Sequence, residues 1–262
     1  MTHILTELDG PIGIVTLNNP DKHNAFDDVL IADLTAALKM LDANDNIRIV
    51  VLSATGKSFS AGADLNWMKR MAGYSEEENF RDAMGLAELM RTLHGMKKAT
   101  IARVQGPAYG GGVGLVACCD MAVGTHAAAF SLSEAKLGLI PAVISPYVIA
   151  AIGERAAHRY FLTAERFDAS EAFRLGLLSE LVTDDDAMDE KINDLTTALL
   201  AASPAAIHEG KQLIAAVANR PIDAMLIEDT ARRIARVRAS AEGKEGLSAF
   251  LGKRKPHWFM EG

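Results

Sequence analysis

The chain has 262 residues, of which 49% are hydrophobic and 23% are charged, and its formal net charge is -7 at pH 7. This length allows one large or two small domains, each with a hydrophobic core. The negative net charge argues against a nucleic-acid-binding surface. No apolar run approaches the ~20 residues that span a bilayer. With neither a signal nor a transit peptide at the N-terminus and only two adjacent cysteines, Cys118 and Cys119, we expect a cytoplasmic protein with no membrane or nucleic-acid partner and no disulfide scaffold.

Strands and helices alternate along the first two thirds of the sequence. Branched apolar runs predict strands at residues 12–17, 48–53 and 99–105, and shorter ones at 121–123, 129–132 and 177–182. Helical spacing of apolar residues predicts helices at 24–41, 76–94, 113–119, 146–152, 154–162 and 171–175. Beyond residue 184 only helices are expected, at 204–217, 222–239 and 243–252. This order is typical of an α/β fold followed by a helical region.

Residues 106–114, GPAYGGGVG, contain five glycines between a predicted strand and a predicted helix. Such a loop brings backbone N–H groups to a helix N-terminus, where they suit negative charge. Three interpretations stay open: an anion or oxyanion site, a tight structural turn, and a dinucleotide fingerprint. The last rests on G-x-G-x-x-A at residues 112–117, with an acidic residue, Glu134, about 20 residues on.

Two further stretches carry candidate chemistry. The residues between Ser60 and Ala63 are all small, which lets their backbone approach a ligand, and Asp64 is suited to cap the following helix. N–H groups from this loop and from the glycine loop can converge on one oxygen and stabilise an enolate. Glu134 is the only carboxylate between Asp120 and Glu154, so it is either a general acid/base in a partly dry pocket or a capping or salt-bridged residue.

Other residue types do not assemble into a site. The histidines show no metal-ligand spacing, no G-x-S-x-G motif marks a nucleophile, and the basic run at residues 253–257 is short. We therefore expect no metal and no separate cofactor.

Seven stretches in order resemble the crotonase (enoyl-CoA hydratase/isomerase) superfamily, over nearly the whole chain. They are residues 19–25, 59–65, 106–112, 119–122, 130–141, 169–177 and 247–255. The resemblance implies a ββα spiral core with the active site, residues 1–195, and a C-terminal helical region, residues 196–262, that forms trimers or hexamers and closes over the coenzyme A (CoA) site. Its implied substrate is an acyl-CoA, so CoA belongs to the substrate.

The resemblance also implies roles for residues at matching positions. The backbone N–H groups of Ala63 and Gly111 would form the oxyanion hole for the thioester carbonyl, and Glu134 would be the catalytic acid/base. The expected CoA-binding residues are Lys22, His23, Ala25, Ala61, Asp64, Leu65, Phe250 and Lys253. The expected acyl-pocket residues are Tyr109, Gly114, Ile140 and Pro141.

One departure from the family pattern concerns the mechanism. Classical hydratases of this family hold water between two glutamates; the first matches Gly114 here, and the second matches Glu134. Residues 65–71, 141–148 and 153–167 resemble a branch similar to 3-methylglutaconyl-CoA hydratase of leucine breakdown and to its isohexenylglutaconyl-CoA counterpart of acyclic terpene breakdown. We therefore expect a hydratase of 3-branched glutaconyl-CoA. A single-glutamate isomerase, an NAD-dependent oxidoreductase and an RNA-binding role are the alternatives, the last disfavoured by the acidic balance.

Overall fold

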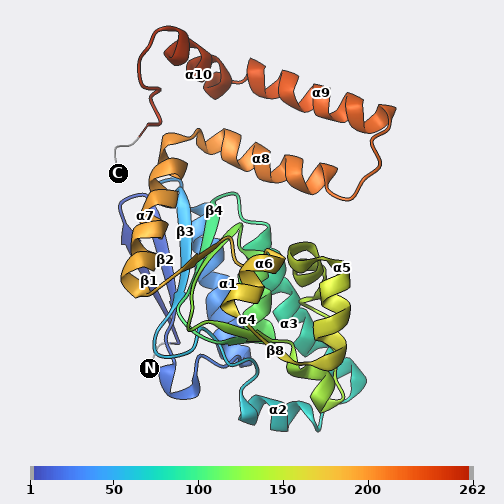
Figure 1. Ribbon diagram of the computed structural model, residues 1–262. Coiled ribbons are helices and arrows are strands. Elements are labelled where there is room, and N and C mark those ends of the chain that lie inside the picture. The colour runs from blue at the N-terminus through green and yellow to red at the C-terminus, as the bar shows by residue number, and fades with distance from the viewer. Residues whose placement is uncertain (1–2, 260–262) are drawn as a thin grey trace. The chain divides into compact units, whose positions relative to one another are not determined.

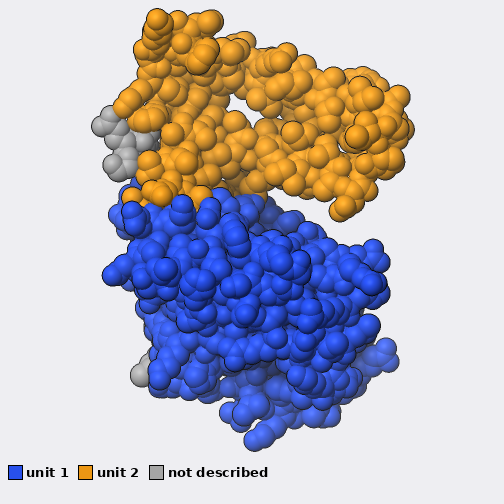
Figure 2. Space-filling view, in the orientation of Figure 1, with its two compact units in different colours: residues 1–96, 100–192 blue, residues 97–99, 193–262 orange. Residues whose placement is uncertain are grey.

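The computed structural model describes residues 3–259 (Figure 1). These residues form two compact units: one extends to residue 96 and resumes from 100 to 192, and the other holds residues 97–99 and those from 193 onward (Figure 2). The first unit combines strands and helices, and the second is almost entirely helical. The predicted α/β class with a helical C-terminal region is confirmed. Within the described residues, no helix is both long and apolar enough to cross a membrane.

The larger sheet has six strands in the order β1-β2-β3-β4-β6-β9. Their bounds are β1 (Ile4–Asp9), β2 (Ile12–Leu17), β3 (Ile49–Ala54), β4 (Ala99–Val104), β6 (Met121–Thr125) and β9 (Glu180–Val182). β1 pairs antiparallel with β2, whereas the β2–β3, β4–β6 and β6–β9 pairs are parallel. Every residue of β3 is buried, as expected for a strand covered on both faces.

A second, three-stranded sheet positions the chemistry. β5 (Ala108–Tyr109) pairs parallel with β7 (Ala129–Ser131), which pairs antiparallel with β8 (Arg166–Asp168). β5 leads into α4 (Gly111–Cys118), and β7 leads into the 3-10 turn η2 (Ser133–Leu137). Parallel neighbours end at the same edge of a sheet. The glycine turn after β5 and the Glu134 segment after β7 are therefore adjacent although about 20 residues separate them.

Helices of the first unit pack as consecutive neighbours around its core. α1 (Asp28–Ala43) packs on α3 (Glu76–His94), α3 on α4, α4 on α5 (Ser145–Thr163), and α5 on α6 (Ala169–Leu175) (Figure 1). The short α2 (Leu65–Met71) follows the second small-residue loop. Gly153 interrupts α5 with φ 78°, so the predicted pair of helices separated by a glycine is confirmed.

The second unit contains α8 (Pro204–Val217), α9 (Ala224–Ala239) and α10 (Ala241–Leu251), and α8, α9 and α10 pack on one another. α7 (Asp185–Ala201) runs from the first unit into the second. Ser203 accepts a hydrogen bond from Ala206 N–H and caps α8, with Pro204 in its first turn, as predicted.

Some boundaries differ from the sequence-based expectation. The helix expected from residue 24 begins at Asp28, because Asp27 caps it by accepting from Leu30 N–H, and a 3-10 turn, η1 (Pro20–Lys22), precedes it. β1, β5 and β8 were not predicted. β5 has two residues and β8 three, which is too short for an alternation pattern to form.

Candidate active site

The two small-residue loops lie against each other. Tyr109 N–H donates to Ser60 O at 2.8 Å, and the N–H groups of Phe59 and Ser60 donate to Pro107 O at 2.9 and 3.2 Å. Gly62 has φ +86°, and a Cβ atom there would lie 3.3 Å from Tyr109 O. A glycine is therefore required for both the backbone conformation and the close approach.

Phe26 holds the loop around Ala63 from the other side. Phe26 N–H donates to Gly62 O at 2.6 Å, and Phe26 O accepts from Asp64 N–H at 2.7 Å, so the peptide group of Ala63 is fixed between two hydrogen bonds. The ring of the same phenylalanine lies 3.2 Å from where a Cβ on Gly111 would be. One buried residue thus contacts both loops.

The N–H groups of Ala63 and Gly111 are available to a ligand. Neither donates to an acceptor within residues 3–259. Gly111 is the first residue of α4, where N–H groups have no partner inside the helix and the helix dipole favours negative charge. Ala63 as a whole residue is exposed.

Glu134 lies beside this pair of loops. A Cβ atom on Gly110 would lie 3.0 Å from Glu134 Oε1 and 4.0 Å from the Cα of Gly62. Glu134 Oε2 is buried and has no hydrogen-bond partner among the described residues. Burial raises the pKa of the Glu134 carboxyl above its usual 4.5, and a hydrogen bond from its own backbone N–H offsets this only in part. These features describe a proton acceptor with an oxygen free for a ligand.

The arrangement joins two kinds of chemistry at one place. A carboxylate with a raised pKa takes up and returns a proton near neutral pH. Two fixed N–H donors stabilise an oxygen on which negative charge develops. Together, they suit proton transfer next to a carbonyl group.

The expected acyl-pocket residues differ in their surroundings. Tyr109 is partly buried and faces Gly62 through its backbone oxygen, Ile140 is 76% exposed, and Pro141 is buried. Gly114 is buried, and Ile144 occupies the space a side chain at residue 114 would fill, with Cγ2 2.3 Å from such a Cβ. The position that a Cβ atom of residue 114 would take is therefore not empty.

Most of the expected CoA-binding residues gather on the first unit. Lys22 Nζ pairs with Asp64 Oδ2 at 2.9 Å, which is the main reason the Asp64 pKa is lowered. Ala61 N–H donates to His23 O at 2.9 Å, and His23 Nδ1 lies 3.0 Å from Ser58 Oγ. The remaining members are Ala25, which is buried, Leu65, which is exposed, and Phe250 and Lys253, which belong to the second unit.

Three positioning residues were missed by the sequence reasoning: Asn24, Phe26 and Ile144. Asn24 is fully buried and donates through Nδ2 to Thr55 O and Ser58 O, while its Oδ1 accepts from Asn19 N–H. A buried asparagine with a full set of partners fixes a loop. In the sequence Asn24 stands between His23 and Ala25, and such a pattern is too common to mark a buried, loop-fixing asparagine.

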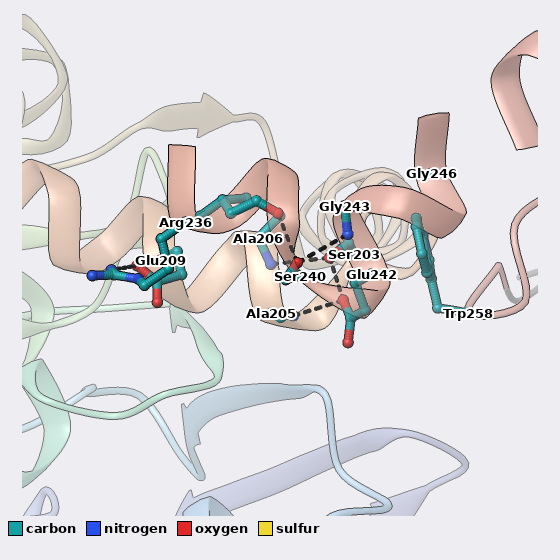
Figure 3. Close-up of a pocket in the computed structure, with 11 residues that line it drawn as sticks. Ser203, Ala205, Ala206, Glu209, Arg236, Ser240, Glu242, Gly243, Gly246 and Trp258 are labelled. Atoms are coloured by element: carbon teal, nitrogen blue, oxygen red, sulfur yellow. Dashed lines mark hydrogen bonds and ion pairs between the residues drawn. The ribbon is translucent and has the colours of Figure 1, made fainter. Parts of the chain in front are cut away.

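A separate cavity lies within the second unit (Figure 3). It has a volume of about 440 Å³ and lies among residues of α8, α9 and α10 and Trp258. Its polar groups pair with one another: Glu242 Oε2 accepts from Ser203 Oγ and from Ala205 N–H, and Arg236 Nη2 donates to Glu209 Oε2. These contacts cap and join helices, and we assign the cavity no chemistry.

The comparisons with known proteins agree over the full length. The enoyl-CoA hydratase/isomerase family model matches residues 7–261. An enoyl-CoA hydratase from Shewanella pealeana is 46% identical, with a TM-score of 0.95, covering 98% of this chain and 96% of that one. The structure of Pseudomonas aeruginosa AtuE is 32% identical, with a TM-score of 0.93, covering 99% and 100%. An enoyl-CoA hydratase from Alternaria alternata is 32% identical over 93% of this chain and 80% of its own.

Proposed function

The chain belongs to the enoyl-CoA hydratase/isomerase family, and from this premise we propose that it is a hydratase of a 3-branched glutaconyl-CoA. 3-Methylglutaconyl-CoA, of leucine breakdown, is the first candidate, and isohexenylglutaconyl-CoA, of terpene breakdown, is the second. The observation that supports a one-carboxylate hydratase is the position of Glu134, partly buried and with Oε2 unpartnered among the described residues beside the two free amides.

In the proposed reaction Glu134 acts twice. Its carboxylate accepts a proton from water as the water oxygen bonds to the β-carbon of the conjugated thioester. The electrons of the double bond move toward the thioester carbonyl and give an enolate, whose oxygen accepts hydrogen bonds from the N–H groups of Ala63 and Gly111. Glu134 then gives the proton to the α-carbon, which completes addition of water on one face.

The thioester's CoA portion is proposed to follow the edge of the first unit. Lys22, His23, Ala61 and Leu65 are all exposed there, and hydrogen bonds join the segments that carry them. A cationic side chain such as that of Lys22 suits the phosphates of CoA. The CoA contacts expected of Phe250 and Lys253, which belong to the second unit, stay a prediction from the family resemblance.

We also propose that the protein assembles into trimers or dimers of trimers through residues 196–262. Its proposed location is the cytoplasm. The second unit exposes large apolar side chains along its helices and their connections, and such surfaces mark contact sites. They are Leu213, Ile214, Ile222, Met225, Ile227, Ile234, Leu247, Phe250 and Leu251.

The main alternative is an isomerase that uses Glu134 and the same two amides to move a proton between carbons. Incubation with 3-methylglutaconyl-, isohexenylglutaconyl- and crotonyl-CoA in ¹⁸O-labelled water separates the two functions. A hydratase incorporates one labelled oxygen and removes the absorbance of the conjugated thioester, whereas an isomerase incorporates none. The proposal fails if neither branched glutaconyl thioester gains labelled oxygen faster than crotonyl-CoA.

A further inference from the structure

The space beside Gly114 is filled by the side chain of Ile144. A Cβ atom on Gly114 would lie 2.3 Å from Ile144 Cγ2, 2.9 Å from Ile144 Cβ and 3.1 Å from Met90 Cε. Real Cβ atoms do not approach other carbons this closely, so no side chain fits at residue 114 while Ile144 is present. Glycine at 114 and isoleucine at 144 are thus two halves of one packing arrangement.

This arrangement is part of the apolar core. Ile144 is 2% exposed, and Met90 is fully buried with its Sδ 3.6 Å from Cys118 Sγ. These side chains come from three different elements, the start of α5, α3 and α4. None of these three side chains is charged, so a carboxylate introduced here while Ile144 is present would be desolvated without a partner.

Gly114 lies one helical turn beyond Gly110, since Gly114 N–H donates to Gly110 O at 3.3 Å. Gly110 is the residue that Glu134 Oε1 touches. Glu134 therefore packs against Gly110 at the start of the first turn of α4, and Ile144 packs against Gly114 at the end of that turn.

We propose that Ile144 is a specificity-determining residue, which keeps the Gly114 side of the site closed and apolar. Water is then ordered by Glu134 and by a polar group on the substrate itself, and thioesters without a distal polar group react poorly. This inference rests on the proposed hydratase function.

The steric part is tested without any substrate. Gly114→Ala alone is expected to lower the melting temperature by several degrees, because the new methyl group meets Ile144. Ile144→Gly removes the two Ile144 atoms and leaves only Met90 Cε, the end of a flexible side chain, at 3.1 Å. Residue 144 is the N-cap of α5, where glycine is well tolerated. In the Ile144→Gly background, Gly114→Ala should therefore cost little or nothing. Equal cost in both backgrounds would overturn the packing argument.

The functional part compares two double variants on crotonyl-CoA, which has no distal carboxylate. Gly114→Glu/Ile144→Gly is expected to hydrate it at least tenfold faster, in kcat/KM, than Gly114→Gln/Ile144→Gly, which has the same shape without the charge. Equal rates would overturn the proposal. If Ile144→Gly does not fold, the same pairs in Ile144→Ala, which retains only the 2.9 Å contact, give the comparison.

Failure of the hydratase proposal has a different signature. In that case the wild-type protein adds no water to branched glutaconyl thioesters, whatever the behaviour of the melting temperatures. Wild-type preference for these thioesters over crotonyl-CoA that persists unchanged in Ile144→Gly would leave the function intact and overturn the role of Ile144.

Discussion

The carboxylate of Glu134 packs directly against the backbone of Gly110, so close that a Cβ atom there would lie 3.0 Å from Oε1. Gly110 also has a positive φ of 50°. The glycine thus serves two needs at once, a turn that residues with a side chain rarely adopt and space for the carboxylate of Glu134. The resulting burial raises the pKa of Glu134, which prepares it to accept a proton.

Glu134→Gln should lower kcat by about 10²–10⁴-fold, the range that general acid–base catalysis contributes. The amide keeps the shape of the carboxyl but accepts no proton from water. Steady-state kinetics on the preferred thioester measure the loss, and KM should change little because the two amide donors remain. Retention of most turnover would contradict the assignment.

The wild-type pH profile follows from the raised pKa of Glu134. The base works in its ionised form, so kcat/KM should fall as pH falls through the folded-state pKa. Because burial raises this pKa, the acidic limb should lie above 4.5, the usual value for glutamate. The limb should disappear from the residual activity of Glu134→Gln. A profile flat down to pH 4.5 would show that another group is the base.

The same shift predicts a stability gain in Glu134→Gln. Because the pKa of Glu134 is raised, the folded state binds the proton more tightly than the unfolded state. The protonated Glu134 therefore stabilises the folded state at pH values below the unfolded-state pKa. This stabilisation is lost as pH rises through the folded pKa. At pH 7–8 the variant should therefore have a higher melting temperature than wild type. Its free energy of unfolding should be higher by about 1.4 kcal/mol for each pKa unit by which burial raises the pKa of Glu134, and this difference should shrink toward pH 4. Melting curves across this range would contradict the prediction if the gap were constant.

Gly110→Ala should remove activity for a local reason, and Gly10→Ala provides a matched control. Both glycines have positive φ, 50° and 53°, but a Cβ on Gly10 meets nothing within 4 Å. A positive φ costs alanine about 1–2 kcal/mol in the left-handed helical region, and the cost at Gly110 should be higher because its ψ is -117°. Only the change at residue 110 displaces Glu134, so kcat should fall only there. An equal loss of kcat in both variants would assign the effect to global instability.

Sequence patterns were sufficient for the long elements and singled out Glu134 as the candidate acid/base, but they did not indicate the contacts that position these parts. The 76–94 helix was predicted to the residue from the spacing of its apolar residues, and the structure adds a capping serine, Ser75, at its start. The parallel pairing of β5 with β7, which brings Gly110 to Glu134, involves two residues of β5. So short a pairing depends on tertiary packing and leaves no local pattern.

The contacts of Phe26 and Ile144 were equally absent from the sequence. The hydrogen bonds of Phe26 to Gly62 and Asp64 use backbone atoms, which any residue has. Ile144 lies 30 residues from Gly114 in the sequence, and nothing local indicates that its side chain fills the space of another residue's Cβ. The sequence shows glycine at residue 114, where classical hydratases of the family have a glutamate. Only the structure shows that the side chain of Ile144 fills the space beside this glycine.

The entry to α2 depends on Asp64, whose Oδ1 accepts from Asn66 N–H at 2.8 Å and Trp67 N–H at 3.1 Å, while Oδ2 pairs with Lys22. Asp64→Ala should lower the free energy of unfolding by about 1 kcal/mol, the typical cost of losing an N-cap. Asp64→Asn keeps an oxygen for the cap and should lose less, because an ion pair with a half-exposed lysine contributes about 0.2–1 kcal/mol.

Urea unfolding at pH 7 distinguishes the cap of Asp64 from its ion pair with Lys22. The lowered pKa of Asp64 means that its stabilising contribution is present above the unfolded pKa and is lost as pH falls through the folded pKa. The gap between wild type and Asp64→Ala should therefore narrow in acid. If Asp64→Asn is as unstable as Asp64→Ala, the ion pair rather than the cap holds α2. Lys22→Ala should then show the same loss, since it removes the pair and leaves both cap hydrogen bonds in place.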